Sequence, residues 1–313
     1  MKFFLEPWDP TTLLPNSQWL PVNPVAAQPV GDWEALEDPA PFTETVFLID
    51  GRERIDQLIV LADGRHGVLF SYAVGAISMR PEWASLELGP QSLSRVLLVP
   101  NEGEAEVLDL GPGLTYQPVM VASEGISGLI EAGRELRQQA EDRLGRRLLD
   151  ANPEALAIHD GPLFPTQRWP ARQIGFAKTE HRTYLSATEA ELLGKLKPGQ
   201  RTPLFRFPGR YQHQGSNRSF FGWYVALPLD PSRPFGPEAG LVRLEAALDM
   251  DESEKLARAS LAIFCRLASR PFRDPRAPQN LIPVGALEWE LGRRLGERAV
   301  IRSRLFRYLG SQN

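Results

Sequence analysis

The sequence predicts an α/β fold, with a central sheet flanked by helices and an extended arm before it. Turn signals divide residues 45–121 into short apolar segments, which are typical of strands. Apolar residues then recur at helical spacing over 123–149, and a further apolar run follows at 155–164. Strand patterns that give way to a long helix pattern and then return indicate a sheet with helices packed on it.

The first 42 residues form the predicted arm. Between Pro7 and Pro41 they are rich in proline, tryptophan and asparagine and keep neither the helix period nor the strand period. We therefore predict an extended arm over 1–42 and one domain over 43–313, which ends in a basic tail. Because the arm holds several Trp and Leu residues, we expect it to pack on its own domain or on a second subunit.

Composition excludes several classes of protein. Hydrophobic residues make up 42% and charged residues 24% of the 313 positions, which is typical of a globular protein. The net charge of −4 argues against a generally basic nucleic-acid coat protein. The single cysteine, Cys265, allows no intrachain disulfide, and no window approaches 18 apolar residues, so we expect a cytoplasmic protein.

The elements follow in order. Strands are predicted as an antiparallel meander over 45–50, 55–62, 66–77, 94–98 and 114–121. A helix is predicted over 123–149 with Ser123 as its N-cap. After a strand at 173–180 we predict the helix "ATEAELLGKL", the strands "SFFGWYVALPL" and "GLVRLEAAL", the helix "DESEKLARASLAIFCRLAS", a helix over 284–295 and a short strand at 299–301.

Two strongly apolar segments run into Asp-Gly, and they carry the predicted chemistry. They are "VFLIDG", with Asp50, and "AIHDG", with Asp160. Asp-Gly by itself is a common turn signal. On neighbouring strands, however, the two carboxylates would repel each other unless a cation lay between them. Oxygen ligands suit Mg²⁺ or Mn²⁺, whereas four scattered histidines and one cysteine give no zinc pattern. Two such ions about 4 Å apart can clamp a scissile phosphate.

Basic and aromatic residues alternate after the second of these motifs. The segments "AKTEHRTYL" and 201–224 contain the candidate DNA-binding residues Lys178, Arg182, Arg201, Arg206, Arg210 and Arg218. This composition is typical of a channel for single-stranded DNA, and equally of a core strand beside a solvated basic loop. Arg243 and Glu245 share one face of a predicted strand, where we expect a structural ion pair.

Five segments together resemble the NurA nuclease family: "FLIDGRERID", "GVLFSYAVGAI", "ELRQQAEDRL", "AIHDGPLF" and "IGFAKTEHRTYL". The resemblance extends from about Thr45 to about Ile301. It implies an RNase H-like core with a mixed sheet, in which acidic residues hold a divalent metal, usually Mn²⁺, for hydrolysis of DNA phosphodiester bonds. It also implies 5′–3′ exonuclease and single-strand endonuclease activity, a homodimer, and action with a hexameric HerA-type ATPase in the resection of double-strand breaks.

The family motifs assign roles residue by residue. Asp50 matches the first aspartate, Asp160 the aspartate of the "DGPL" motif and Glu141 the helical glutamate, for which Glu131 and Glu135 are alternatives. Lys178 matches a lysine expected near the scissile phosphate. The chain departs from the family at Arg52, where many members have a small residue. It departs again at Leu287 and Glu288, where Ala-His is common, so Glu288 is a candidate further metal ligand.

Two other functions stay open. The chain could be a catalytically silent DNA-binding or scaffold subunit of the same fold. It could also be an unrelated metal-dependent phosphohydrolase that acts on a small phosphoester.

Overall fold

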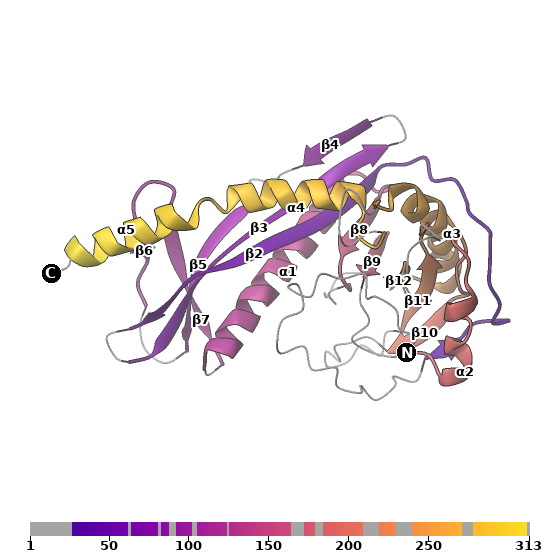
Figure 1. Cartoon of the computed structure of the whole chain (residues 1–313), viewed down its shortest axis with the longest axis horizontal. Helices are drawn as coiled ribbons and strands as arrows, with labels where there is room; N and C mark the ends of the chain where they lie inside the picture. The colour runs from indigo at the N-terminus through magenta and orange to yellow at the C-terminus, as the bar shows by residue number, and fades with distance from the viewer. Residues whose placement is uncertain are drawn as a thin grey trace, which may run out of the picture. The chain divides into compact units, whose positions relative to one another are not determined.

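The computed structural model divides into two compact units (Figure 1). Unit 1 contains Met1–Leu48, Ser78–Ala84 and Leu149–Gly285, and unit 2 contains Ile49–Ile77, Ser85–Leu148 and Ala286–Asn313. The structure describes residues 27–61, 64–80, 83–87, 92–101, 105–123, 125–163, 172–178, 184–208, 219–229, 240–270 and 278–311. Residues 1–26, most of the predicted arm, therefore lie outside the described part.

Unit 1 is built on a mixed sheet. Its strands follow the order β1 (Gln28–Pro29), β10 (Phe205–Pro208), β11 (Ser219–Ala226), β12 (Leu241–Ala246), β9 (Gln173–Ala177) and β8 (Leu156–Asp160). All of these pairs are antiparallel except β8 and β9, which are parallel. The amide of Leu156 donates to the carbonyl of Thr45, which places the start of β2 (Val46–Val60) beside β8.

Helix α3 (Met250–Leu267) covers one face of the unit 1 sheet. Asp249 caps its first turn by accepting a hydrogen bond from the Glu252 amide at 2.9 Å. Phe264 packs edge-on against Phe176 of β9, with ring centroids 4.9 Å apart, and Trp223 of β11 joins the same core. Successive strand residues point to opposite faces of the sheet, so Tyr224 lies on the face opposite to Trp223. There it belongs to a second core cluster with residues of α2 (Ala187–Ala190) and of the 3₁₀ helix η2 (Leu193–Lys195).

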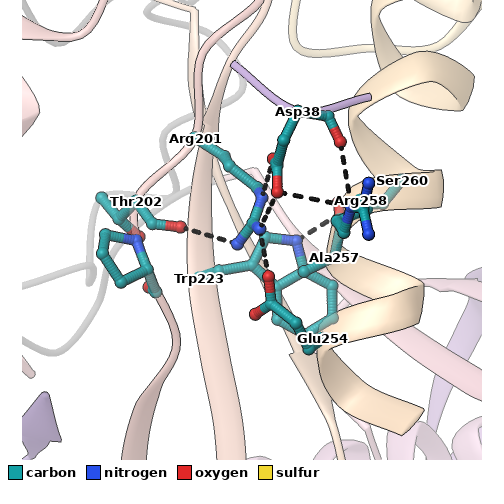
Figure 2. A network of polar contacts seen from close by, with 9 residues as sticks. Asp38, Arg201, Thr202, Trp223, Glu254, Ala257, Arg258 and Ser260 are labelled. Carbon is teal, nitrogen blue, oxygen red and sulfur yellow. Dashed lines mark hydrogen bonds and ion pairs between the residues drawn. The ribbon is translucent and has the colours of Figure 1, made fainter. Parts of the chain in front are cut away.

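The described part of the arm packs on unit 1. The amide of Val30 donates to Leu204, and Leu36 and Arg201 exchange two main-chain hydrogen bonds. The fully buried Arg201 guanidinium also binds both carboxylate oxygens of Asp38, at 2.8 and 2.7 Å, and contacts Glu254 of α3 (Figure 2). Residues 27–42 are therefore held by main-chain pairing and by an ion-pair cluster around the buried Arg201.

Unit 2 has three layers. Its sheet runs β2, β3 (His66–Arg80), β5 (Leu93–Pro100), β7 (Thr115–Val121) and β6 (Leu108–Asp109), and β4 (Trp83–Glu87) pairs with β3. Helix α1 (Gly125–Ala151) approaches Phe70 and Leu98 so closely that a Cβ on Gly133 would lie 3.0 Å from both. Leu69, which precedes Phe70 on β3, belongs to a core cluster with Ile301 of α5 (Arg298–Ser311). Adjacent strand residues face opposite ways, so α1 and α5 cover opposite faces.

Four sequence predictions about elements are wrong. The helix predicted over 187–196 is two short helices, α2 and η2. The strands predicted at 45–50 and 55–62 are one strand, β2, because Gly51 keeps an ordinary φ and makes no turn. The meander is not wholly antiparallel, since β5 and β7 are parallel. The strand predicted at 299–301 is the start of α5, in which Ile301, Leu305 and Tyr308 recur at helical spacing and pack on the sheet.

The fold class itself is confirmed, because both units carry mixed sheets flanked by helices. Most of helix α4 (Ile282–Arg294) belongs to unit 2. None of the helices in the described ranges is long and apolar enough to span a membrane.

Candidate active site

Asp50 lies inside β2, at the point where the strand leaves the core. Val46 to Asp50 are all buried, whereas the residues from Gly51 onward are mostly partly exposed. The Asp50 side chain, in a residue only 6% exposed, accepts a hydrogen bond from the amide of Gly51 at 2.8 Å. The carboxylate is therefore held by a continuous strand, and the prediction that it ends one was wrong.

Gly51 brings β2 into close contact with α1. A Cβ at this position would overlap the carboxylate of Glu141 and lie 3.0 Å from Cγ of Arg137. The glycine is required by this close approach and not by a positive φ. Glu141, which is 7% exposed, is thereby placed next to the strand that carries Asp50. The alternatives Glu131 and Glu135 lie on the exposed face of α1.

Arg137 neutralises the carboxylates around it in unit 2. It forms ion pairs with Glu141 and, at 2.9 Å, with Glu53, which also pairs with Arg134 at 3.0 Å. Burial alone lowers the pKa of the Arg137 guanidinium, but the charges of Glu141, Glu53 and Asp50 outweigh it and raise that pKa. Three carboxylates of unit 2 therefore act on one partly buried cation.

Arg52, the departure from the family pattern, anchors α4. Its Nη1 donates to the main-chain carbonyl of Glu288 at 3.1 Å, and its guanidinium lies against Gly292, where a Cβ would be 3.2 Å from Nη1. Glu288 is half-buried on this helix. The long side chain of Arg52 therefore fixes α4, the helix that carries the candidate ligand Glu288. No local sequence pattern indicates this contact.

In unit 1, Asp160 ends β8 and pairs with Lys178. Gly161 has a φ of +120°, so this second Asp-Gly is a true strand end. Lys178 Nζ lies 2.5 Å from Asp160 Oδ2 and 2.6 Å from Oδ1 of the buried Asn280. The parallel pairing of β8 and β9, in which Asp160 is opposite Phe176, brings the lysine two residues further on to the aspartate. Asn280 is a site residue that sequence reasoning missed.

A buried ion pair supports the backbone after Asp160. Arg243 Nη1 lies 2.5 Å from Glu245 Oε2, and the other carboxylate oxygen of Glu245 accepts from the amide of Leu163 at 2.7 Å. Arg243 also stacks over the Tyr184 ring, 4.5 Å from its centroid. Burial alone lowers the Arg243 pKa, but Glu245 outweighs it and raises that pKa. The expected structural ion pair is thus present.

The predicted DNA-binding residues other than Lys178, which pairs with Asp160, separate into three groups. Arg206 is exposed and lies over the Phe221 ring, 5.4 Å from its centroid. Arg201 is buried with Asp38 and Glu254, which gives it a structural role. Arg182, Arg210 and Arg218 lie outside the described residues. The aromatic residues of 201–224 that the structure describes are buried, so they form core and not a stacking surface: Phe205, Phe207, Phe220, Phe221, Trp223 and Tyr224.

Fold and site together define an α/β protein of two mixed-sheet units, with buried carboxylates on β2 and α1 in one and an aspartate–lysine pair in the other. The NurA domain family matches residues 66–284, more than half of the chain, and the chain belongs to this family. The matched range includes Glu141, Asp160 and Lys178 and begins after Asp50.

A solved structure is also similar to this chain. The crystal structure of the NurA nuclease from Sulfolobus solfataricus covers 90% of this chain and 86% of its own, with 12% sequence identity and a TM-score of 0.48. No curated protein matches the chain.

Proposed function

We propose that this protein is a DNA nuclease that depends on a divalent metal ion. The observation that carries the proposal is the placement of Asp50 and Glu141, two buried carboxylates of unit 2, near the partly buried guanidinium of Arg137. Burying a carboxylate costs free energy, and buried carboxylates with strong charge interactions are enriched at functional sites. Membership of the NurA family supports nucleic-acid hydrolysis as that role.

The donors fit a hard cation. Carboxylate oxygens are the ligands preferred by Mg²⁺ and Mn²⁺. We propose that four carboxylates hold the metal, as the family resemblance implies: Asp50, Glu141, Asp160 and Glu288. We propose Mn²⁺ in preference to Mg²⁺, because the family resemblance implies Mn²⁺ as the usual ion.

The mechanism assigns each residue a separate task. A bound divalent metal would supply an activated water and stabilise the leaving 3′ oxygen. Asp50 and Glu141 orient the site through the rigid contact of β2 with α1. Lys178, which pairs with Asp160 in the structure, would turn to a non-bridging oxygen of the scissile phosphate and offset the charge that develops there.

The cellular role is carried over from the family resemblance. We propose 5′–3′ exonuclease and single-strand endonuclease activity in resection of double-strand breaks, by a homodimer that works with a hexameric HerA-type ATPase. Stimulation of cleavage by such an ATPase, and the mass of the protein in solution, test these assignments.

The test of the proposed function is cleavage of labelled linear DNA with Mn²⁺ or Mg²⁺. Asp50→Ala and Glu141→Gln should abolish cleavage while the melting temperature shows a folded protein. Glu135→Gln, an exposed glutamate on the same helix, is the matched control and should cleave normally. Full activity of Asp50→Ala would contradict the assignment, and a wild-type protein that binds DNA without cleaving it would favour the scaffold alternative.

A further inference from the structure

A groove in unit 2 is lined mainly by arginine. It has a volume of about 590 Å³ and lies between β2 and the last turns of α4, with one residue from α5. We call it the α4–β2 groove, and its lining residues are Arg52, Glu53, Arg54, Trp289, Gly292, Arg293, Leu295 and Arg298. Four of these eight residues carry a positive charge and one carries a negative charge, so the groove favours an anionic ligand.

Trp289 presents its ring to solvent beside this groove. It is 69% exposed, the largest value among the exposed large apolar side chains of the described residues. A tryptophan at such exposure contributes little to a core, since most of its apolar surface stays in water. Its flat ring is therefore available to stack on another planar group.

Three of the five charged side chains of the groove form ion pairs with described residues, and two arginines do not. Glu53 pairs with Arg134 and Arg137, Arg54 with Asp56, and Arg293 with Glu290. Arg52 and Arg298 instead donate to main-chain carbonyls, of Glu288 and Ile55. Within the described part of the chain, neither of these two forms an ion pair with a carboxylate. Guanidinium groups of this kind bind phosphate oxygens through their forked donors.

We propose that the α4–β2 groove binds single-stranded nucleic acid, with Trp289 stacking on an unpaired base and with Arg52 and Arg298 binding neighbouring phosphates. A positive groove beside one exposed aromatic ring is the arrangement that holds unpaired strands. Four arginines face one glutamate among the eight lining residues, and this excess of positive charge favours a polyanion as the ligand. The choice of a DNA strand as ligand rests on the proposed nuclease function.

The groove would also guide the strand toward the candidate ligand on α4. Glu288 directly precedes Trp289, and its main-chain carbonyl accepts the hydrogen bond from Arg52. Arg52 thus contacts α4, the helix that carries the candidate metal ligand Glu288, and in our proposal it also binds a phosphate. The departure from the family at position 52 gains a function in strand binding.

The experiment is fluorescence anisotropy of a labelled single-stranded oligothymidylate, in EDTA so that no metal-dependent cleavage occurs. Trp289→Ala should raise Kd about fivefold or more, from the loss of one stacked base at roughly 1 kcal/mol or above. Trp289→Phe keeps an aromatic face and should retain most of the affinity. Arg147→Gln, an exposed arginine of α1, is the charge-matched control and should bind as the wild type does.

The arginines have a separate signature. In Arg52→Gln/Arg298→Gln, the plot of log K against log salt concentration should be less steep by about 1.4, because two phosphate contacts to a single strand are lost. Melting temperatures report whether this variant still folds, and Trp289→Ala tests the groove independently because the ring is exposed.

Unchanged Kd for Trp289→Ala together with an unchanged salt slope for the double variant would overturn the inference. The inference would also be overturned if Trp289→Ala weakened binding to a blunt duplex as much as binding to the oligothymidylate, because stacking requires an unpaired base. Wild-type protein that binds the oligonucleotide through the groove but cleaves nothing with Mn²⁺ contradicts only the proposed nuclease function. Cleavage by the wild type with unaltered binding by both groove variants contradicts only this inference.

Discussion

The carboxylate of Glu141 lies against the backbone of Gly51, in the space that any side chain at position 51 would need. This contact joins the strand that carries Asp50 to the helix that carries Glu141. The geometry of the two carboxylates in unit 2 therefore depends on one missing methyl group.

Gly51→Ala should damage the site through this contact. The added Cβ would overlap the Glu141 carboxylate and press on Arg137, so we expect a loss of about 1–3 kcal/mol in the free energy of unfolding. Cleavage should fall with it. Denaturant unfolding measures the effect, with Gly310→Ala as control because a Cβ there meets no atom within 4 Å. Equal stability of the two variants would contradict the close contact.

Arg137→Met should destabilise the protein mainly when metal is absent. It leaves the buried Glu141 without this cation and Glu53 with Arg134 alone, so we expect a loss of about 1–3 kcal/mol. Saturating Mn²⁺ should restore part of this loss if the ion binds the same carboxylates. Thermal melting with and without Mn²⁺ measures both effects. Arg143→Met, on an exposed position of α1, should show neither of them.

Lys178→Met should separate metal binding from cleavage. Lys178 now pairs with Asp160, so its removal frees a proposed ligand and should leave Mn²⁺ affinity equal or higher. Cleavage should fall about 100-fold, because a donor to the scissile phosphate is lost. Titration calorimetry gives the affinity and a single-turnover assay gives the rate. Unchanged cleavage would remove Lys178 from the mechanism.

Tyr116 should make stability fall at high pH. Burial and then the charge of Asp56, to which the hydroxyl donates at 2.8 Å, raise the Tyr116 pKa well above its ordinary value. Its contribution is complete below the unfolded pKa of about 10 and is lost as the pH rises above it, by at most about 1.4 kcal/mol per unit. Unfolding free energies from pH 9 to 11 should fall more steeply for the wild type than for Tyr116→Phe. Tyr308→Phe should follow the wild type.

The sequence was sufficient for what depends on local pattern. The turn after Asp160 and the long helix with Glu141 follow from glycine chemistry and from apolar spacing, and the structure has both. The first Asp-Gly was misinterpreted because glycine serves close approach as well as turns, and only the position of Glu141 distinguishes the two uses. The short apolar run at 299–301 was ambiguous because strand and helix share it, and packing of Ile301 on the sheet decided for a helix.

Contacts between distant residues could not be predicted. Asn280 binds Lys178 across 102 positions, and Arg52 binds the helix at Glu288 across 236. Arg201 had the composition of a DNA-binding residue, yet its guanidinium is buried against Asp38 and Glu254. In each case the partner decides the role of the side chain, and the spacing along the chain contains no sign of that partner.

The most direct test of the proposed metal site is a crystal structure of the protein soaked in Mn²⁺, with the metal located by its anomalous scattering. The account predicts density within about 2.3 Å of carboxylate oxygens of Asp50, Glu141 and Asp160, with Lys178 turned away from Asp160. Mn²⁺ bound elsewhere, or absent at saturating concentration while Lys178 still pairs with Asp160, would contradict it.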